Sequence, residues 1–202
     1  MGDSHVVSLT DSEYNKSINY KFERIGNRYV LFLSLWFKDT LAYNVSKKIF
    51  SRDIAFKAYL LGLLRFVGAR YYFNFGEIDI RCHLAKIDKR ADFLSLYVYN
   101  CKKLVKANSN RIFFLTPTPP SDFYENHPSF PRFGELSDRM KAYTEFCQSL
   151  AIAAGQQSCK FINMSVELLS VSDGLRVELT DDGCHLNQKG ASLVRELVLA
   201  YH

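Results

Sequence analysis

The alternation of short apolar runs with amphipathic helical segments most constrains the fold of this chain. Residues 29–36, 71–75, 111–116 and 160–166 are rich in β-branched and aromatic side chains, which predicts strands. Apolar side chains at helical spacing predict helices at 51–67, 91–107, 135–154 and 187–201. The run at 29–36 is apolar except for Ser34, as in parallel strands that are buried on both faces. This order predicts one α/β domain over residues 1–202, with helices on both faces of a parallel sheet.

Composition and charge limit the kinds of molecule that we expect this chain to bind. Hydrophobic residues make up 48% of the 202 residues and charged residues 23%, which excludes a disordered chain. The net charge of +5 is spread along the chain without a recognisable nucleic-acid module, so no nucleic-acid partner is predicted. Five cysteines without C-x-x-C spacing predict reduced thiols. No apolar run near the start is long enough to span a bilayer, so we expect a cytoplasmic protein without a membrane partner.

Three polar segments are expected near the carboxyl edge of the sheet, where open α/β sheets bind their ligands. They are residues 2–5, 76–83 and 181–187. Ser4 supplies a hydroxyl nucleophile and His185 a base that could remove its proton. Asp182 comes three residues before His185 and can reach the other ring nitrogen within one turn. These residue types are those of a Ser-His-Asp triad, although Gly-Asp-Ser and Asp-Gly are also common turn sequences.

Three blocks of the chain resemble the SGNH/GDSL hydrolase superfamily. They are Gly2-Asp3-Ser4-His5, Gly76-Glu77-Ile78-Asp79 and Asp182-Gly183-Cys184-His185. The resemblance implies a three-layer α/β/α, flavodoxin-like fold that hydrolyses or transfers acyl groups on carbohydrates, lipids or small esters. It further implies that Ser4 is the nucleophile and an oxyanion donor through its backbone N–H, that His185 is the base and that Asp182 orients it. No metal or organic cofactor is implied.

The chain departs from the family pattern in the middle block. Ile78 stands where the family has an asparagine that donates to the oxyanion, and an isoleucine cannot donate. Asn44, Asn74 or Arg81 could replace that donor. The glycine of the family's second block has no counterpart in residues 38–44.

The start of the chain is short for this fold. Only three residues precede Ser4, whereas the family's nucleophile follows a central strand of about five residues. We therefore expect the first strand to be missing or truncated and the chain to be a fragment. The alternative is that residues 4–9 form that strand, which would take Ser4 away from the catalytic edge.

The residues after the second strand are expected to bind substrate. In an extended segment Asp79, Arg81 and His83 would share one face. Arg81 would then hold an anionic or sugar substrate, or form a structural pair with Asp79. Gly76, Glu77, Asp79, Arg81 and Asn44 are accordingly the predicted oxyanion-binding and substrate-binding residues.

Other chemistries fit the sequence less well. Adjacent Cys-His pairs at 82–83 and 184–185 have zinc-ligand types without zinc spacing, and His185 cannot readily face Cys184 to activate it. The leading hypothesis is a serine esterase or acyl transferase acting on O-acyl groups, notably O-acetyl groups, of a glycan or small ester. A catalytically inactive SGNH-like binding module and a flavodoxin-like phosphate or nucleotide binder remain as alternatives.

Overall fold

A parallel three-stranded sheet forms the centre of the molecule in the computed structural model, which describes residues 1, 10, 18–25, 27–35, 41–48, 52–82, 92–122, 132–170 and 174–201. The strands are β3 (Tyr71–Phe73), β4 (Ile112–Leu115) and β5 (Lys160–Ile162), in the order β3-β4-β5. Phe73 pairs with Phe114, and Phe114 pairs with Phe161. The predicted α/β class with a parallel sheet is therefore confirmed.

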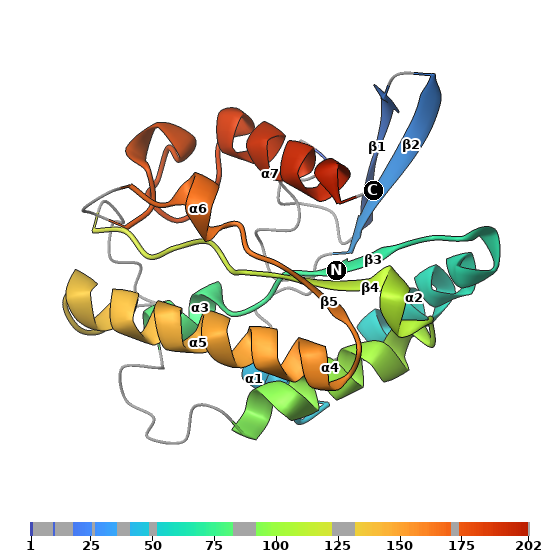
Figure 1. Ribbon diagram of the computed structural model, residues 1–202, viewed down its shortest axis with the longest axis horizontal. Coiled ribbons are helices and arrows are strands. Elements are labelled where there is room, and N and C mark those ends of the chain that lie inside the picture. Colours follow the sequence, from blue (N-terminus) through green and yellow to red (C-terminus); the bar gives the residue numbers. More distant parts are fainter. Residues whose placement is uncertain are drawn as a thin grey trace.

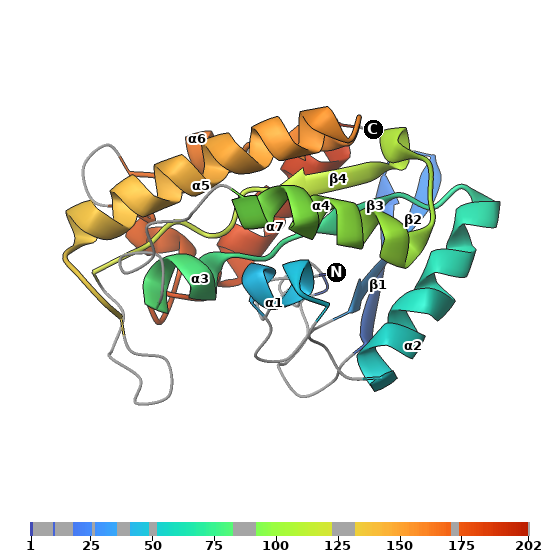
Figure 2. The same ribbon diagram turned by 90° about the horizontal axis from the view of Figure 1, so that it is seen from below.

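Helices cover both faces of this sheet, as Figures 1 and 2 show. One face carries α6 (Ser165–Leu168) and α7 (Gln188–Ala200). The other face carries α1 (Ala42–Ser46), α3 (Glu77–Cys82), α4 (Asp92–Val105) and α5 (Leu136–Gln156). The remaining helices are α2 (Arg52–Gly62) and the short 3-10 helices η2 (Leu63–Val67), η4 (Ser109–Arg111) and η5 (Val177–Leu179). Within the described ranges no helix is long and apolar enough to cross a membrane.

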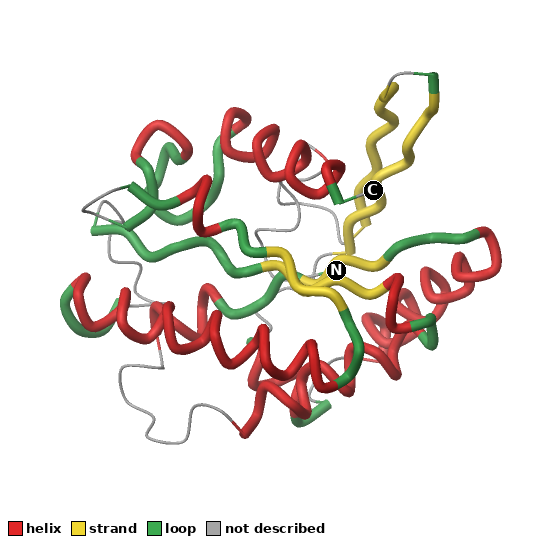
Figure 3. Tube along the Cα trace, in the orientation of Figure 1, coloured by secondary structure: helices red, strands yellow, loops and turns green. Residues whose placement is uncertain are grey.

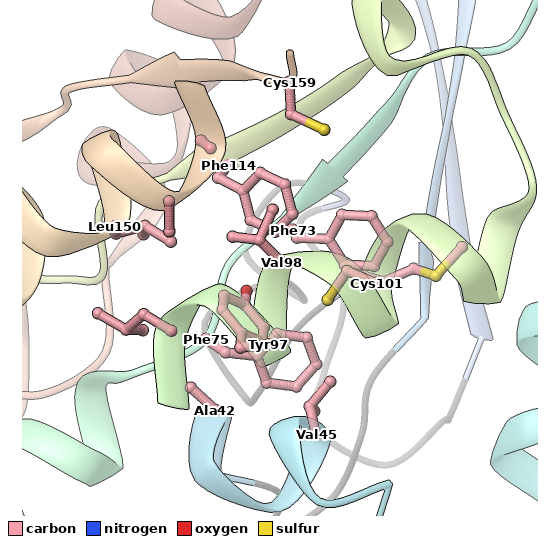
Figure 4. Close-up of a cluster of buried hydrophobic side chains, with 14 of the residues drawn as sticks. Ala42, Val45, Phe73, Phe75, Tyr97, Val98, Cys101, Phe114, Leu150 and Cys159 are labelled. Atoms are coloured by element: carbon pink, nitrogen blue, oxygen red, sulfur yellow. The ribbon is translucent and has the colours of Figure 1, made fainter. Parts of the chain in front are cut away.

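The core is divided between the two faces of the sheet because successive strand residues point in opposite directions. Ile112 and Phe114 belong to a cluster with residues of α1, α4 and α5 (Figure 4). Phe113 and Leu115 belong to a second cluster with residues of α6 and α7. The rings of Phe73 and Phe114 stack with centroids 5.4 Å apart, which joins neighbouring strands within the first cluster.

The apolar run at 29–36 does not join the parallel sheet, so that prediction is wrong. It forms β2 (Arg28–Leu35), which pairs antiparallel with β1 (Ile18–Ile25) in a hairpin that projects from the body of the molecule (Figure 3). Its inner face packs Phe32 against the second core cluster. Its outer face exposes Tyr20, Phe22 and Tyr29. A continuous apolar run predicts a strand but does not specify the strand's partner.

Met1 lies beside β3 in the manner of a parallel strand. Its ammonium group donates a hydrogen bond to the Tyr72 carbonyl oxygen at 2.5 Å, and the Asn74 N–H donates to the Met1 carbonyl oxygen at 3.0 Å. This pattern sets Met1 opposite Phe73, with the chain running in the same direction as β3. Met1 therefore lies along β3, where a further parallel strand would extend the sheet. Residues 2–9, including the alternative strand at 4–9, lie outside the described residues.

Candidate functional site

The loop between η5 and α7 is fixed by its own polar groups. The Thr180 hydroxyl donates to the His185 carbonyl oxygen at 2.7 Å and accepts from the Gly183 N–H at 2.9 Å. Gly183 has φ +74°, a left-handed conformation that glycine adopts without steric cost. Asn187 then caps α7, since its side-chain oxygen accepts from the N–H groups of Lys189 and Gly190, both at 3.1 Å.

This loop brings Asp182 and His185 together. The Asp182 Oδ2 atom lies 2.6 Å from His185 Nδ1. The other carboxylate oxygen, Oδ1, accepts the backbone N–H groups of Cys184 at 2.8 Å and His185 at 2.6 Å. The carboxylate is thereby held by the backbone on one side and holds the imidazole on the other. The His185 side chain is 32% exposed, so the ring stands at the surface rather than in the core.

The charge state of Asp182 suits this role. Partial burial raises the pKa of its carboxyl group, but hydrogen bonds from the His185 ring and from the backbone of His185 and Cys184 outweigh burial. The pKa is therefore well below its ordinary value, and the carboxylate is ionised at neutral pH. An ionised carboxylate at Nδ1 fixes both the ring orientation and the tautomer.

The neighbouring carboxylate has a different partner. The Asp181 Oδ1 atom accepts a hydrogen bond from the Asn187 side-chain amide at 3.2 Å. Asp181 therefore supports the cap of α7, while Asp182 contacts the histidine.

The segment after β3 is helical, so the extended arrangement that would place Asp79 and Arg81 on one face is wrong. In α3, Glu77 and Arg81 lie one turn apart and form an ion pair with Arg81 Nε 2.5 Å from Glu77 Oε1. Both side chains are almost fully buried. Glu77 and Asp79 are two positions apart, and a helix does not place alternate residues on one face. Their carboxylates therefore contact different partners. His83 lies outside the described residues.

Asp79 connects α3 with α1. Its Oδ2 atom accepts the Ala42 N–H at 2.7 Å, and its Oδ1 atom accepts the Tyr43 N–H at 3.3 Å. These contacts provide hydrogen-bond acceptors for the backbone N–H groups in the first turn of α1. The same helix carries the half-buried Asn44. Ile78, at the family's donor position, is 7% exposed. Asp79 therefore joins α3 to the first turn of α1, the helix that carries Asn44.

The ion pair sets the charge state of Arg81. Burial lowers the pKa of Arg81, but the Glu77 carboxylate raises it well above its ordinary range. Gly76, which precedes α3, has φ +122° and no room for a side chain against Phe146.

The three sequence blocks do not reveal two further residues of this region, Thr180 and Asn74. Thr180 organises the loop, and the only sequence signal for it is a hydroxyl residue just before an Asp-Asp-Gly turn. Asn74 is buried at the carboxyl end of β3, and its side-chain oxygen accepts no hydrogen bond from any residue that the structure describes.

The remaining polar groups do not form a metal site among the described residues. In those ranges no three side chains of His, Cys, Asp or Glu come close enough to hold a metal ion. Burial raises the pKa of the Cys82 thiol to about 11, as in a structural thiol. A surface hollow borders the loop between η5 and α7 at Asp181 and Asn187. It is lined by polar side chains that include Arg176, Glu178, Asp181 and Lys189.

Comparisons with known proteins give a fold likeness at low sequence identity. No family model matches the chain, and no curated protein matches it by sequence. A solved structure from Streptococcus pneumonia, named for platelet activating factor, is 16% identical, covers 71% of this chain and 68% of its own, and has a TM-score of 0.51. A GDSL-like lipase from Bacteroides thetaiotaomicron is 17% identical over 71% of this chain and 69% of its own, with a TM-score of 0.49. A carbohydrate acetylesterase from Sinorhizobium meliloti is 14% identical over 73% and 68%, with a TM-score of 0.44.

The fold likeness agrees with the arrangement of the sequence blocks. Asp182 and His185 meet before the last helix, and the block at 76–79 follows the strand beside which Met1 lies. The chain therefore shares its fold with the structure from Streptococcus pneumonia over 71% of its length.

Proposed function

We propose that the protein is a serine esterase or acyl transferase that acts on O-acyl groups, notably O-acetyl groups, of a carbohydrate or small ester. The observation that carries the proposal is the 2.6 Å contact between Asp182 Oδ2 and His185 Nδ1. With Nδ1 held by an ionised carboxylate, Nε2 is the nitrogen that exchanges a proton with the nucleophile.

In this proposal Ser4 attacks the ester carbonyl carbon while His185 Nε2 takes the hydroxyl proton. The resulting imidazolium gives that proton to the leaving alkoxide, and an acyl-enzyme remains. Water or a sugar hydroxyl then attacks the acyl-enzyme, with His185 again acting as the base. Ser4 itself lies outside the described residues. Chain connectivity supports its role, because three residues span at most about 11 Å and Met1 lies beside β3 near its carboxyl end.

The developing oxyanion has fewer donors in this proposal than in the family pattern. The Ser4 backbone N–H remains a donor, whereas Ile78 offers none. Removing one such donor typically costs about 10²–10³ in rate, so we expect slow turnover. Arg81 is engaged by Glu77, which leaves the side-chain amides of Asn44 and Asn74 as the stronger candidates for a second donor.

The proposal is tested by ester hydrolysis with a panel of short acyl esters and O-acetylated sugars. We expect hydrolysis by the wild type and a fall in kcat of about 10²–10⁴ for His185→Ala and for Asp182→Asn, because each removes base catalysis. Asp181→Asn is the matched control and should keep its activity, since Asp181 contacts Asn187 rather than the histidine. Circular dichroism would confirm that each variant is folded.

A catalytically inactive binding module is the second candidate, and Ile78 at the donor position favours it. The same panel separates the two functions. A folded protein that binds an acetylated sugar but never releases acetate would support the module. Hydrolysis that His185→Ala leaves unchanged would contradict the triad.

A further inference from the structure

The helix α2 and its continuation η2 present an apolar stripe to solvent rather than to the core. The stripe recurs at helical spacing, and each of its side chains is at least 37% exposed. We call it the α2 surface; it consists of Phe56, Tyr59, Leu60, Leu63, Phe66 and Val67. The opposite side of α2 faces α4, where the place of a side chain on Gly62 would be 3.1 Å from the Val105 carbonyl oxygen. Within the part of the chain that the structure describes, the stripe is therefore exposed because a different face of the helix packs.

Cations accompany this surface, and the one acidic residue of α2 is Asp53 in its first turn. Lys106 Nζ lies 5.9 Å from the ring centroid of Tyr59, and the Arg65 guanidinium lies 4.3 Å from that of Phe66. The Arg111 guanidinium reaches the Arg65 carbonyl oxygen at 3.4 Å. The sequence carries no acidic residue between Asp53 and Glu77, and none between Asp92 and Asp122. These two acid-free stretches, residues 54–76 and 93–121, together carry Lys57, Arg65, Arg70, Lys102, Lys103, Lys106 and Arg111.

We infer that the α2 surface docks the protein on an anionic lipid bilayer. A helix with exposed aromatic and aliphatic side chains and flanking cations is suited to lie in the membrane interface. Its apolar face enters the headgroup region and its cations meet anionic lipids. Charge favours lipid over protein as the occupant, because every charged residue from Phe56 to Gly76 is basic, whereas an apolar helix alone would not require such a flank. The docking is peripheral and adds no spanning segment.

The position of this surface leaves the candidate site open. Because η2 leads into β3, the α2 surface lies near the amino end of that strand, whereas α3 follows its carboxyl end. Figures 1 and 2 both show α2 at the end of the molecule remote from α3. A bilayer at the α2 surface would therefore hold the protein without covering the Asp182–His185 loop.

Co-sedimentation of the full chain with phosphatidylcholine vesicles, with and without phosphatidylglycerol, tests this inference. We expect binding to the anionic vesicles that salt weakens. Arg65→Gln combined with Lys106→Gln should weaken it about fivefold for each cation removed. Phe66→Ser combined with Val67→Ser should weaken it about tenfold or more, because both side chains would lose their apolar contact with lipid. Phe66 and Val67 are 77% and 80% exposed, so these changes should leave the fold intact.

Remote variants of the same chemistry are the matched controls. Lys141→Gln on α5 and Val166→Ser on α6 remove an exposed cation and an exposed apolar side chain elsewhere, and neither should alter binding. The inference would be overturned if the folded protein failed to bind anionic vesicles, or if the α2 surface variants bound as the wild type does. It would equally be overturned if lipid-free protein self-associated and Phe66→Ser with Val67→Ser abolished that association, which would assign the surface to a second copy. None of these measurements depends on ester turnover.

Discussion

At the scale of single residues, the side chain at position 78 limits the proposed chemistry. Ile78 follows Gly76 and Glu77 in the block where the family places an amide donor. We predict that Ile78→Asn raises kcat for a short acyl ester, by up to about 10²–10³, because it restores a hydrogen-bond donor to the oxyanion. Steady-state kinetics on the purified variant would measure the change.

The control for that substitution is Ile78→Val, which alters packing without adding a donor. Ile78 is almost fully buried, so thermal unfolding of each variant should accompany the kinetics. A folded Ile78→Asn variant whose kcat equals that of Ile78→Val would show that position 78 does not face the oxyanion.

Residues close together in sequence could be predicted, and residues that meet only through the fold could not. Asp182 and His185 are three positions apart, so a single turn suffices to join them. Asp79 contacts Ala42, 37 positions away, and no local pattern announces that contact. The ion pair of Glu77 and Arg81 was missed because the segment was expected to be extended, and only a helix brings residues i and i+4 together.

At the scale of elements, the turn from β3 into α3 depends on Gly76. A Cβ at this position would lie 2.4 Å from the Cζ atom of Phe146, which is itself buried, and φ is +122°. We predict that Gly76→Ala lowers the free energy of unfolding by about 2–4 kcal/mol, from backbone strain and overpacking together. Chemical denaturation would measure the loss.

Gly155→Ala is the matched control for that prediction. Gly155 lies within α5, and no atom comes within 4 Å of the place where its Cβ would stand. We expect this substitution to raise the free energy of unfolding by about 0.5–1 kcal/mol, because alanine is the better helix former. Equal effects at the two glycines would contradict the described geometry of Gly76.

Among the elements, the four longer helices and the sheet strands could be predicted from periodicity, but the short helices α1, α3 and α6 could not, nor could the partners of the elements. The sequence predicted strands at 71–75 and 111–116, and β3 and β4 lie there. The apolar stripe predicted a helix at 51–67, and the structure exposes Tyr59, Leu63 and Val67 of that stripe. A hydrophobic stripe indicates that a helix has an apolar face, but it does not indicate what covers that face. A search for long apolar runs likewise detects only spanning segments and misses an interfacial helix.

At the scale of the whole molecule, the pH dependence of stability should report the site. The pKa of Asp182 is lowered in the folded state from an ordinary value of 3.8. The carboxylate therefore stabilises the fold above about pH 3.8, and this contribution is lost as pH falls through the folded-state pKa. We predict that the difference in unfolding free energy between the wild type and Asp182→Asn is constant near neutral pH and shrinks below pH 3.8.

Asp181→Asn, which removes the same charge one residue away, is the control for this titration. Denaturation curves collected across the acid range for all three proteins would give the differences. A difference for Asp182→Asn that stayed constant down to the acid transition would contradict the charge-stabilised loop.

The division of the core into two clusters around one sheet also belongs to this scale. The alternation of elements predicted helices on both faces, and the side chains of β4 do point alternately into the two clusters. The hairpin of β1 and β2 lies outside that arrangement, because a long apolar strand can pair with its neighbour in sequence as readily as with the sheet.

Reaction with a fluorophosphonate probe tests the central claim, an activated serine opposite the Asp182–His185 pair, most directly. We predict that intact-protein mass spectrometry detects one covalent adduct and that peptide mapping locates it at Ser4. The adduct should be absent in Ser4→Ala and should form much more slowly in His185→Ala, because the imidazole must take the hydroxyl proton. The proposed role of Ser4 would be contradicted if the folded wild-type protein remained unlabelled. It would also be contradicted if the adduct lay on another serine and still formed in Ser4→Ala.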